Sequence, residues 1–210
     1  MLLRKEHIDD GGLIGIGTIS GDYRELLRLL PAGQLQAAKE VISKMRSERR
    51  VMEWLTTRVL LFELLGEEKI IDNQPDGRPF LVDGSYKISI SHTREYAALL
   101  LHRECPVGID VETISERVKR LSEKFISEHE YIDPSQQVIH QLLHWSAKET
   151  MFKVMEEREI DFKIHLRVHP FQPGMKGHFQ ASESKTLQRK TYQIHYEILP
   201  GAVLTWVVDR

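Results

Sequence analysis

The sequence predicts an α+β fold made of two halves, and the order of its patterns indicates this class. Helical periodicity fills the stretch from residue 22 to residue 65 and strand patterns follow it. A second series of helices followed by strands begins near residue 107. Because strands follow strands near the end of each half, an α+β arrangement fits better than a wound parallel sheet. The expected halves are residues 1–103 and 104–210.

The first half is expected to place one strand before its helices and two after them. Apolar residues that recur every three or four positions predict the helices, whereas short apolar runs bounded by glycine, proline or polar residues predict strands. In chain order, we expect a strand at 13–19, a helix at 22–30 that stops at Pro31, a helical stretch at 32–65 with one break near 43–47, a turn at 73–79, and strands at 87–91 and 96–102.

The second half repeats this order of elements with a longer final set of strands. The same two periodicities give the assignments. In chain order, we expect a strand at 107–112, helices at 115–125 and 136–157, and strands at 163–169, 177–181, 192–198 and 203–209. Residues 171–190 suggest no functional role.

The composition excludes several classes of protein. The 210 residues carry 29 basic and 31 acidic side chains. Because these charges nearly cancel, the overall electrostatic field of the protein does not favour binding to nucleic acid or to an anionic membrane. The single cysteine, Cys105, excludes an internal disulfide framework and fits a reducing compartment. Charged residues interrupt positions 1–10, and no run approaches the roughly 20 apolar residues of a membrane span. We therefore expect a cytoplasmic protein that binds neither nucleic acid nor membrane.

Two short segments of the second half carry carboxylates and lysines at spacings that suit a metal-bound phosphate. Asp110 and Glu112 would share one face of a strand, because side chains alternate with a period of two. Glu149 and Lys153 would share one stripe of a helix, one turn apart. Together they could cage Mg²⁺ and a diphosphate. Taken singly, each segment also fits a solvated strand edge or a surface Glu–Lys pair.

Polar residues elsewhere suggest one further phosphate contact and argue against a zinc site. Ser91 and His92 end a strand in a polar turn, where a hydroxyl, an imidazole and backbone N–H groups can converge on an anion. Arg78 places a cation on a stiff turn. His140 and His144 lack the H-E-x-x-H pattern and a third ligand, so we interpret them as helix-surface residues.

Five segments occur in a fixed order and together carry a resemblance to a known family. They are Gly77-Arg78-Pro79, Ser89-Ile90-Ser91-His92, Gly108-Ile109-Asp110-Val111-Glu112, the run from Phe125 to Tyr131 and the run from Trp145 to Lys153. In this order they resemble the 4'-phosphopantetheinyl transferases, from about Arg49 to Lys153. The likeness is to the larger type, in which two similar α+β halves form a pseudo-dimer with the active site at their interface.

The resemblance implies an enzyme of the holo-[acyl-carrier-protein] synthase type. Such an enzyme transfers the phosphopantetheine arm of coenzyme A to a serine of an acyl or peptidyl carrier protein and releases adenosine 3',5'-bisphosphate. The implied metal, Mg²⁺ or Mn²⁺, would be bound by Asp110, Glu112 and Glu149, and the implied catalytic residues are Glu149 and Lys153. The implied coenzyme-binding residues are Arg49 (or Arg50), Arg78, Ser91, His92, Asp110, Lys148 and Lys153. The first half would bind the 3'-phosphate, and we expect a monomer.

Two other functions stay open on the residues alone. A magnesium-dependent phosphohydrolase or nuclease would also use acids and a lysine, although the charge is balanced and no basic, aromatic-rich surface is indicated. A non-catalytic carrier-binding module would keep the fold without needing the full set of acids.

Carrier proteins are acidic, so we expect them to dock on a basic face of this protein. The candidate face comprises Arg117, Lys119, Arg120 and Lys124. The alternative is that these residues form a solvated helix face without a partner.

Overall fold

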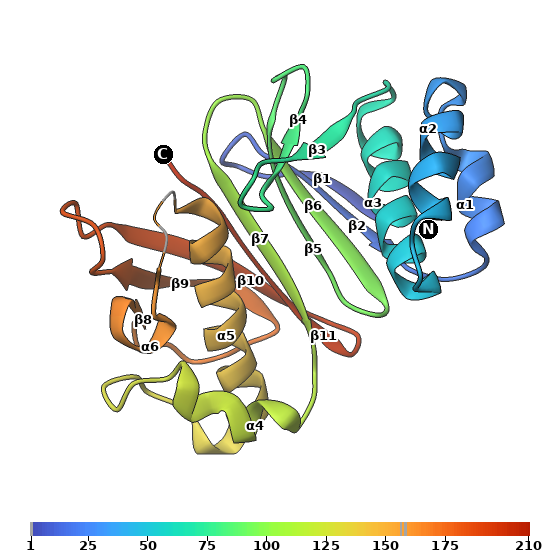
Figure 1. Ribbon diagram of the computed structural model, residues 1–210. Coiled ribbons are helices and arrows are strands. Elements are labelled where there is room, and N and C mark those ends of the chain that lie inside the picture. Colours follow the sequence, from blue (N-terminus) through green and yellow to red (C-terminus); the bar gives the residue numbers. More distant parts are fainter. Residues whose placement is uncertain (1, 156, 158) are drawn as a thin grey trace. The chain divides into compact units, whose positions relative to one another are not determined.

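Two units make up the chain, and each combines an antiparallel sheet with helices (Figure 1). The structure is a computed structural model that describes residues 2–155, 157 and 159–210. The units comprise Met1–Cys105 and Pro106–Arg210, so the boundary falls two residues after the expected one. Because helices and antiparallel strands follow one another in blocks within each unit, the predicted α+β class is confirmed.

The N-terminal unit is built on a four-stranded sheet with the strand order β1-β2-β6-β5, in which every neighbouring pair is antiparallel. Helix α3 contacts β2 and β6 and also packs against α1. The larger strands are β1 (Leu2–His7), β2 (Leu13–Thr18), β5 (Lys87–His92) and β6 (Tyr96–His102), and β3 (Ile71–Asn73) pairs with β4 (Pro79–Leu81) in a separate hairpin. The helices are α1 (Tyr23–Leu29), α2 (Ala32–Ser43) and α3 (Glu48–Leu65).

The break in the long helical stretch lies where the sequence predicts it. α2 ends at Ser43, and α3 begins at Glu48 after the N-cap Ser47. The Ser47 hydroxyl accepts a hydrogen bond from the backbone N–H of Arg50 at 3.5 Å, which satisfies one of the first-turn donors. At the other end, Gly66 adopts a φ of 70° and closes the helix in the left-handed conformation.

Strand β1 and the short strands β3 and β4, which flank the predicted turn, are the elements of this unit that the sequence did not predict. β1 is the longest of the three. It pairs only with β2, and four of its six side chains are exposed. Because a strand of this kind buries little, its sequence carries no alternation of apolar and polar residues. In the described part of the chain, none of the helices has the length and apolar character that crossing a bilayer requires.

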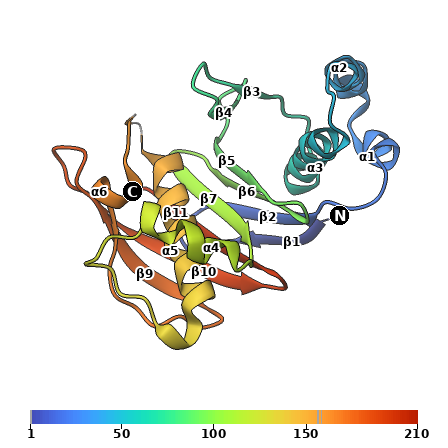
Figure 2. The same cartoon turned by 60° about the horizontal axis from the view of Figure 1, so that its bottom comes forward.

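The C-terminal unit is built on a five-stranded antiparallel sheet with the order β7-β11-β10-β9-β8. Helix α5 lies across one face of this sheet and contacts mainly β7 and β11 (Figure 2). The strands are β7 (Val107–Thr113), β8 (Leu166–Val168), β9 (Lys176–Glu183), β10 (Thr191–Leu199) and β11 (Ala202–Val208). The helices are α4 (Arg117–Leu121), α5 (Gln137–Val154) and α6 (Phe162–His165), with 3₁₀ turns at Ser122–Lys124 and Pro134–Gln136.

Two expected elements of this unit are wrong in extent. The strand predicted at 163–169 begins as the helical turn α6, because the Asp161 side chain accepts hydrogen bonds from the backbone N–H groups of Lys163 and Ile164 and so caps a helix. The helix predicted to reach residue 157 ends at Val154. Met155 is extended and buried, so its side chain packs in the core instead of continuing the helical stripe. The predicted positions 156 and 158 lie outside the described residues.

The two units repeat one topology. In each, the strand that precedes the helices pairs with the last strand of the unit, and that last strand also pairs with the strand before it. The matching sets are β2-β6-β5 and β7-β11-β10. Each unit also packs one 18-residue helix, α3 or α5, against the first and last strands of its set. Helix α5 thereby holds its residues directly over β7.

A glycine on the first strand of each set permits the close approach of the long helix. A Cβ atom added at Gly108 of β7 would lie 2.2 Å from the backbone carbonyl oxygen of Thr150 in α5. A Cβ atom added at Gly15 of β2 would lie 2.4 Å from a methyl carbon of Leu64 in α3. Both distances are far below van der Waals contact. At Gly108 the obstructing atom is helix backbone, so a side chain there would require a shift of α5, whereas at Gly15 the side chain of Leu64 would have to move.

We expect Gly108→Ala to lower the free energy of unfolding by about 1–3 kcal/mol, because the new methyl group overpacks against rigid helix backbone. Denaturant titration of the purified protein measures the loss. Gly174→Ala is the matched control, since its added Cβ would meet nothing closer than the Tyr196 hydroxyl at 3.7 Å. Equal midpoints for both variants would contradict the close approach of α5 to β7.

Candidate functional site

The C-terminal unit brings four of the predicted site residues together, two from β7 and two from α5. Gly108 faces α5, so Asp110 and Glu112, two and four positions further along β7, present their side chains on the same helix-facing side of the sheet. Glu149 and Lys153 stand one turn apart on α5. A strand face with two acids and a helix stripe with an acid and a base therefore meet, as the sequence predicts.

A seam of hydroxyl groups fixes α5 on the sheet beneath these residues. The hydroxyls of Ser146 and Thr150 lie 2.8 and 2.7 Å from the Thr205 hydroxyl on β11, and all three residues are fully buried. Thr205 is the register partner of Asp110 on β7. Buried hydroxyls need hydrogen-bond partners, so this seam fixes the rotation of the helix relative to the strands.

Lys153 bridges the helix and the strand at the centre of the cluster. Its Nζ donates to Asp110 Oδ1 at 2.8 Å and to the backbone carbonyl of Ile109 at 2.9 Å. Asp110 is 3% exposed, so its ion pair with Lys153 lies in a poorly solvated place. Charge-assisted hydrogen bonds of this kind are short and directional, and they hold the ammonium beside the carboxylates.

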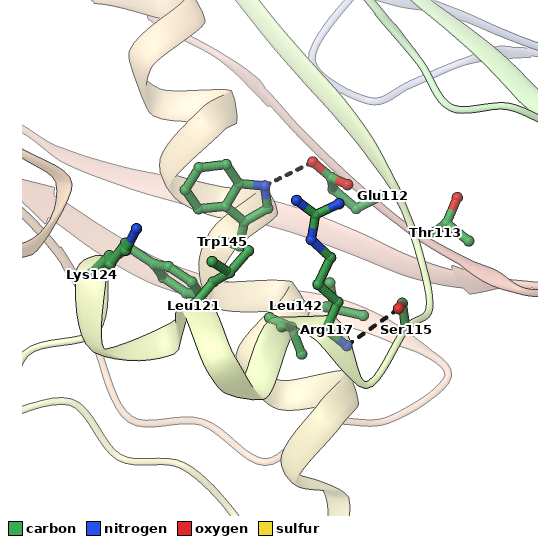
Figure 3. Close-up of a pocket in the computed structure, with 10 residues that line it drawn as sticks. Glu112, Thr113, Ser115, Arg117, Leu121, Lys124, Leu142 and Trp145 are labelled. Atoms are coloured by element: carbon green, nitrogen blue, oxygen red, sulfur yellow. Dashed lines mark hydrogen bonds between the residues drawn. The ribbon is translucent and has the colours of Figure 1, made fainter.

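Glu112 is held by an aromatic residue of α5. Trp145 Nε1 donates to Glu112 Oε1 at 2.7 Å (Figure 3). Burial raises the pKa of Glu112 above its usual range, and the neighbouring charge of Asp110 raises it further. The hydrogen bond from Trp145 and the charge of Lys153 act in the opposite direction.

Glu149 has the most strongly perturbed carboxyl group of the cluster. Burial raises its pKa to about 7, with further increases from the charges of Asp110 and Glu112 and an opposing effect of Lys153. A carboxyl group with such a pKa exchanges its proton near neutral pH, which suits a general base. The same perturbation shows that three negative charges are disfavoured in this place unless a cation joins them.

The donor set fits a divalent metal by its chemistry. Asp110, Glu112 and Glu149 offer hard oxygen ligands of the kind that Mg²⁺ accepts, and their mutual repulsion would be relieved by its charge. Within the residues that the structure describes, no three His, Cys, Asp or Glu side chains are gathered closely enough to form a metal cluster. Lys153 and Trp145 instead hydrogen-bond to two of the three carboxylates.

Lys148 is placed differently from the predicted coenzyme contact. It is completely buried, and its Nζ donates to the Phe125 carbonyl at 2.5 Å, to Glu130 Oε2 at 2.8 Å and to the Phe162 carbonyl at 3.1 Å. Glu130 in turn accepts from the backbone N–H groups of Ser127 and Val168. All three ammonium hydrogens thus have acceptors inside the protein, which favours a structural role for Lys148 over a phosphate contact.

In the N-terminal unit, Arg49 and His92 converge on a residue that the sequence analysis missed. Arg49 Nε lies 3.3 Å and His92 Nδ1 lies 3.7 Å from the same oxygen, Oε1 of Glu53. No sequence motif marked Glu53, and only its spacing of four from Arg49 on a helix could have indicated the pair. The arginine that shares the Glu53 carboxylate with His92 is Arg49, and Arg50 donates its backbone N–H to the cap Ser47.

The other two residues predicted for the 3'-phosphate lie on a strand and in a turn of the same unit. Ser91 is buried on β5, beside His92. Arg78 lies in the turn between β3 and β4, and its Nε lies 3.4 Å from the Asp76 carboxylate. The structure thus brings Arg49 and His92 together, whereas Arg78 is paired within its own turn.

The interpretation of His140 and His144 as surface residues is wrong. Both are buried on α5, 0% and 1% exposed, and Phe171 packs against both rings. His140 Nδ1 accepts the backbone N–H of Asp133, and His144 Nδ1 hydrogen-bonds to the carbonyl of His140. The absence of a zinc motif says nothing about burial, which is why the sequence did not reveal their packing role.

A cavity of about 380 Å³ adjoins Glu112 in the C-terminal unit (Figure 3). Its wall combines apolar side chains with the basic residues Arg117 and Lys124 and with Trp145, whose indole binds Glu112. The complete lining is Glu112, Thr113, Ser115, Arg117, Val118, Leu121, Lys124, Phe125, Leu142 and Trp145. The cavity therefore joins an apolar surface to the edge of the carboxylate cluster.

Comparisons with known proteins agree with the geometry of this unit. A family model described as ACPS, the 4'-phosphopantetheinyl transferase superfamily, matches residues 106–205. The chain is also 30% identical over 128 residues to the 4'-phosphopantetheinyl transferase gsp of Aneurinibacillus migulanus. That alignment covers 57% of this chain and 53% of the relative, so the chain spans about half the length of the curated relative it matches.

The range matched by the family model begins just before β7 and ends within β11. It includes Asp110, Glu112, Glu149 and Lys153, the residues that the close approach of α5 to β7 brings together. The C-terminal unit of this chain, nearly all of which the family model matches, belongs to the 4'-phosphopantetheinyl transferase superfamily.

Proposed function

We propose that this protein transfers the 4'-phosphopantetheine group of coenzyme A to a serine of an acyl or peptidyl carrier protein, as a holo-[acyl-carrier-protein] synthase of the two-halved type. The observation that carries the proposal is the joining of Asp110, Glu149 and Lys153 in the unit that the family model matches. This cluster combines oxygen donors for a metal, a carboxyl group that exchanges its proton near neutral pH, and a fixed cation.

The proposed reaction is a phosphoryl transfer. The serine oxygen forms a bond to the phosphorus that carries the pantetheine arm, while the bond from that phosphorus to the bridging oxygen breaks. The serine proton goes to a base, and the bridging oxygen leaves with adenosine 3',5'-bisphosphate. Positioning and electrostatic stabilisation supply most of the rate in reactions of this class.

Each residue of the cluster has a role that its surroundings support. Glu149, with its raised pKa, accepts the serine proton directly or through water. Lys153, held by Asp110 and the Ile109 carbonyl, offers its remaining N–H to the negative charge that develops on the leaving bisphosphate. Asp110, Glu112 and Glu149 would hold Mg²⁺ or Mn²⁺, which when bound neutralises the diphosphate and polarises the attacked phosphorus.

Residues of the N-terminal unit are proposed to bind the 3'-phosphate of coenzyme A. Arg49 and His92 converge in the structure, Ser91 adjoins His92, and Arg78 supplies a cation from a turn. Arginine binds phosphate oxygens with two parallel hydrogen bonds, which makes Arg49 the strongest candidate of the set.

The carrier protein is proposed to dock on the basic face of the segment around α4. Arg117 and Lys124 both lie on the wall of the cavity beside Glu112, which supports this position. Lys119 forms an ion pair with Glu116 at 2.7 Å, so its charge is partly compensated within the helix. We further propose that the protein is a monomer in the cytoplasm.

Mass spectrometry of candidate apo-carriers incubated with the protein, coenzyme A and Mg²⁺ tests the proposal directly. We expect each accepted carrier to gain the mass of one phosphopantetheine. Release of adenosine 3',5'-bisphosphate without any carrier modification would indicate a phosphohydrolase instead. A carrier that binds without modification or hydrolysis would indicate a non-catalytic module.

We expect Asp110→Asn and Glu149→Gln to lower the rate of carrier modification by about 10²-fold or more, because each removes a carboxylate from the reacting centre. The rate is measured with saturating coenzyme A and Mg²⁺. Glu128→Gln, which neutralises an exposed acid of the same unit, is the control. Near-normal transfer by either site variant, with folding verified by circular dichroism, would refute the site assignment.

A second prediction concerns the stability of the metal-free protein. The pKa of Glu149 in the folded protein is about 7, against 4.5 for an ordinary glutamate, so between these two pH values the folded state holds a proton that the unfolded state has lost. Its contribution to the free energy of unfolding therefore falls as the pH rises from 4.5 to 7, and Glu149→Gln removes this slope. Urea titrations of both proteins measure the difference between the two profiles.

Addition of Mg²⁺ should then stabilise the wild type more than Glu149→Gln at a pH above 7, because binding to the folded state raises the free energy of unfolding. Parallel stability profiles for the two proteins, with and without Mg²⁺, would argue against both the raised pKa and the metal role of Glu149.

The 3'-phosphate assignment predicts a difference between two coenzymes. Arg78→Ala and His92→Ala should each raise the KM for coenzyme A by about tenfold, and they should raise the KM for 3'-dephospho-coenzyme A much less. Arg94→Ala, which removes an exposed arginine from the turn after His92, is the control. Equal losses with both coenzymes would rule out a contact with the 3'-phosphate.

A further inference from the structure

Glu53 occupies an unusual place for an acid in a unit that is proposed to bind a phosphate. It lies within α3, and the residue is only 7% exposed. One oxygen of its carboxylate, Oε1, faces both Arg49 Nε at 3.3 Å and His92 Nδ1 at 3.7 Å. The two basic groups come from different elements, α3 and β5, and meet at this single acceptor.

The burial of the three side chains is unequal, and this asymmetry indicates which of them orders the others. The side chain of Glu53 is 9% exposed, whereas those of Arg49 and His92 are 67% and 42% exposed. A buried side chain is restricted by its packing, while an exposed arginine loses considerable rotamer entropy when it is fixed. Glu53 therefore acts as the rigid member that limits the positions of Arg49 and His92.

The contacts also leave the phosphate-binding edges of both groups available for a ligand. Arg49 faces Glu53 through Nε, so its two Nη nitrogens remain as donors for the paired oxygens of a phosphate. His92 faces Glu53 through Nδ1, so an imidazolium at this position would still donate from Nε2. A ligand and Glu53 can thus bind opposite edges of the same two side chains.

We propose that Glu53 is a positioning residue for the 3'-phosphate of coenzyme A, which it serves by holding Arg49 and His92 in place before the coenzyme binds. This role rests on the proposed function. The alternative is competition: a carboxylate that binds the same basic side chains as the phosphate would weaken coenzyme binding. The two effects change the KM in opposite directions when the charge of Glu53 is removed.

Glu53→Gln tests the proposal, because it keeps the size of the side chain and removes its charge. We expect the KM for coenzyme A to rise by about threefold to tenfold with kcat unchanged, which lies in the lower part of the range of coupling between residues in contact. The KM for 3'-dephospho-coenzyme A should not change, and a purely structural role could not produce this difference. Glu63→Gln, which changes a half-buried glutamate of the same helix, is the control.

The double variant Arg49→Ala, Glu53→Gln sharpens the test. If Glu53 acts through Arg49, its substitution adds little once Arg49 is gone, so the two effects on the KM are non-additive. Glu53→Asp, which keeps the charge on a shorter side chain, provides a second variant if Glu53→Gln unfolds. We expect Glu53→Asp to raise the KM for coenzyme A alone, by less than Arg49→Ala does.

A lower KM for coenzyme A in Glu53→Gln would overturn the proposal, because Glu53 would then compete with the phosphate. Equal changes with both coenzymes, or fully additive effects in the double variant, would overturn it as well. If the wild type transfers phosphopantetheine and prefers coenzyme A over its 3'-dephospho form, any of these outcomes overturns the role of Glu53 and leaves the proposed function intact. A wild type without transfer or affinity for coenzyme A would overturn the proposed function itself.

Discussion

The close approach of α5 to β7 at Gly108 is the constraint on which the candidate site depends. A side chain at this position would penetrate the backbone of Thr150, so the absence of one sets the distance between helix and strand. The buried hydroxyls of Ser146 and Thr150, both bonded to Thr205, then fix the rotation of the helix. Gly108 of the Gly-Ile-Asp-Val-Glu segment is thus a packing residue. Its close contact with α5 determines how near Asp110 and Glu112 lie to the helix.

Two lysines of α5 lie in different surroundings, although both belong to the same helix. Lys148 is buried with Glu130 and two backbone carbonyls, which together satisfy every hydrogen of its ammonium group. Separation of Lys148 from Glu130 would leave a buried charge without compensation. This ion pair therefore fixes α5 to the segment that contains Glu130. Lys153 lies beside Asp110 with its side chain 24% exposed, where an incoming anion can share it. Lys148 and Lys153 thus lie five positions apart on one helix, the first enclosed by the protein and the second partly exposed.

Much of this could be predicted from the sequence, because the relevant signals are local. The break before Ser47, the stop at Gly66 and the acid spacing on β7 all follow from capping, conformation and alternation. Non-local properties could not be predicted. The burial of Lys148 depends on Glu130 and on carbonyls far along the chain, and the convergence at Glu53 requires the end of β5 to come close to α3. A sequence shows which residues are present, but the fold decides which of them share a partner.

The repeated topology makes the difference in chemistry between the units informative. Counted from the helix-facing glycine, the positions of Asp110 and Glu112 on β7 correspond to Gly17 and Ile19 in the N-terminal unit, so that unit has no acids there. It presents instead an arginine and a histidine whose side chains both face the buried carboxylate of Glu53. Coenzyme A carries a diphosphate and a separate 3'-phosphate, which differ in what they need: a metal and a proton acceptor for the first, fixed cations for the second. In the proposed function, one scaffold used twice with different side chains serves both groups.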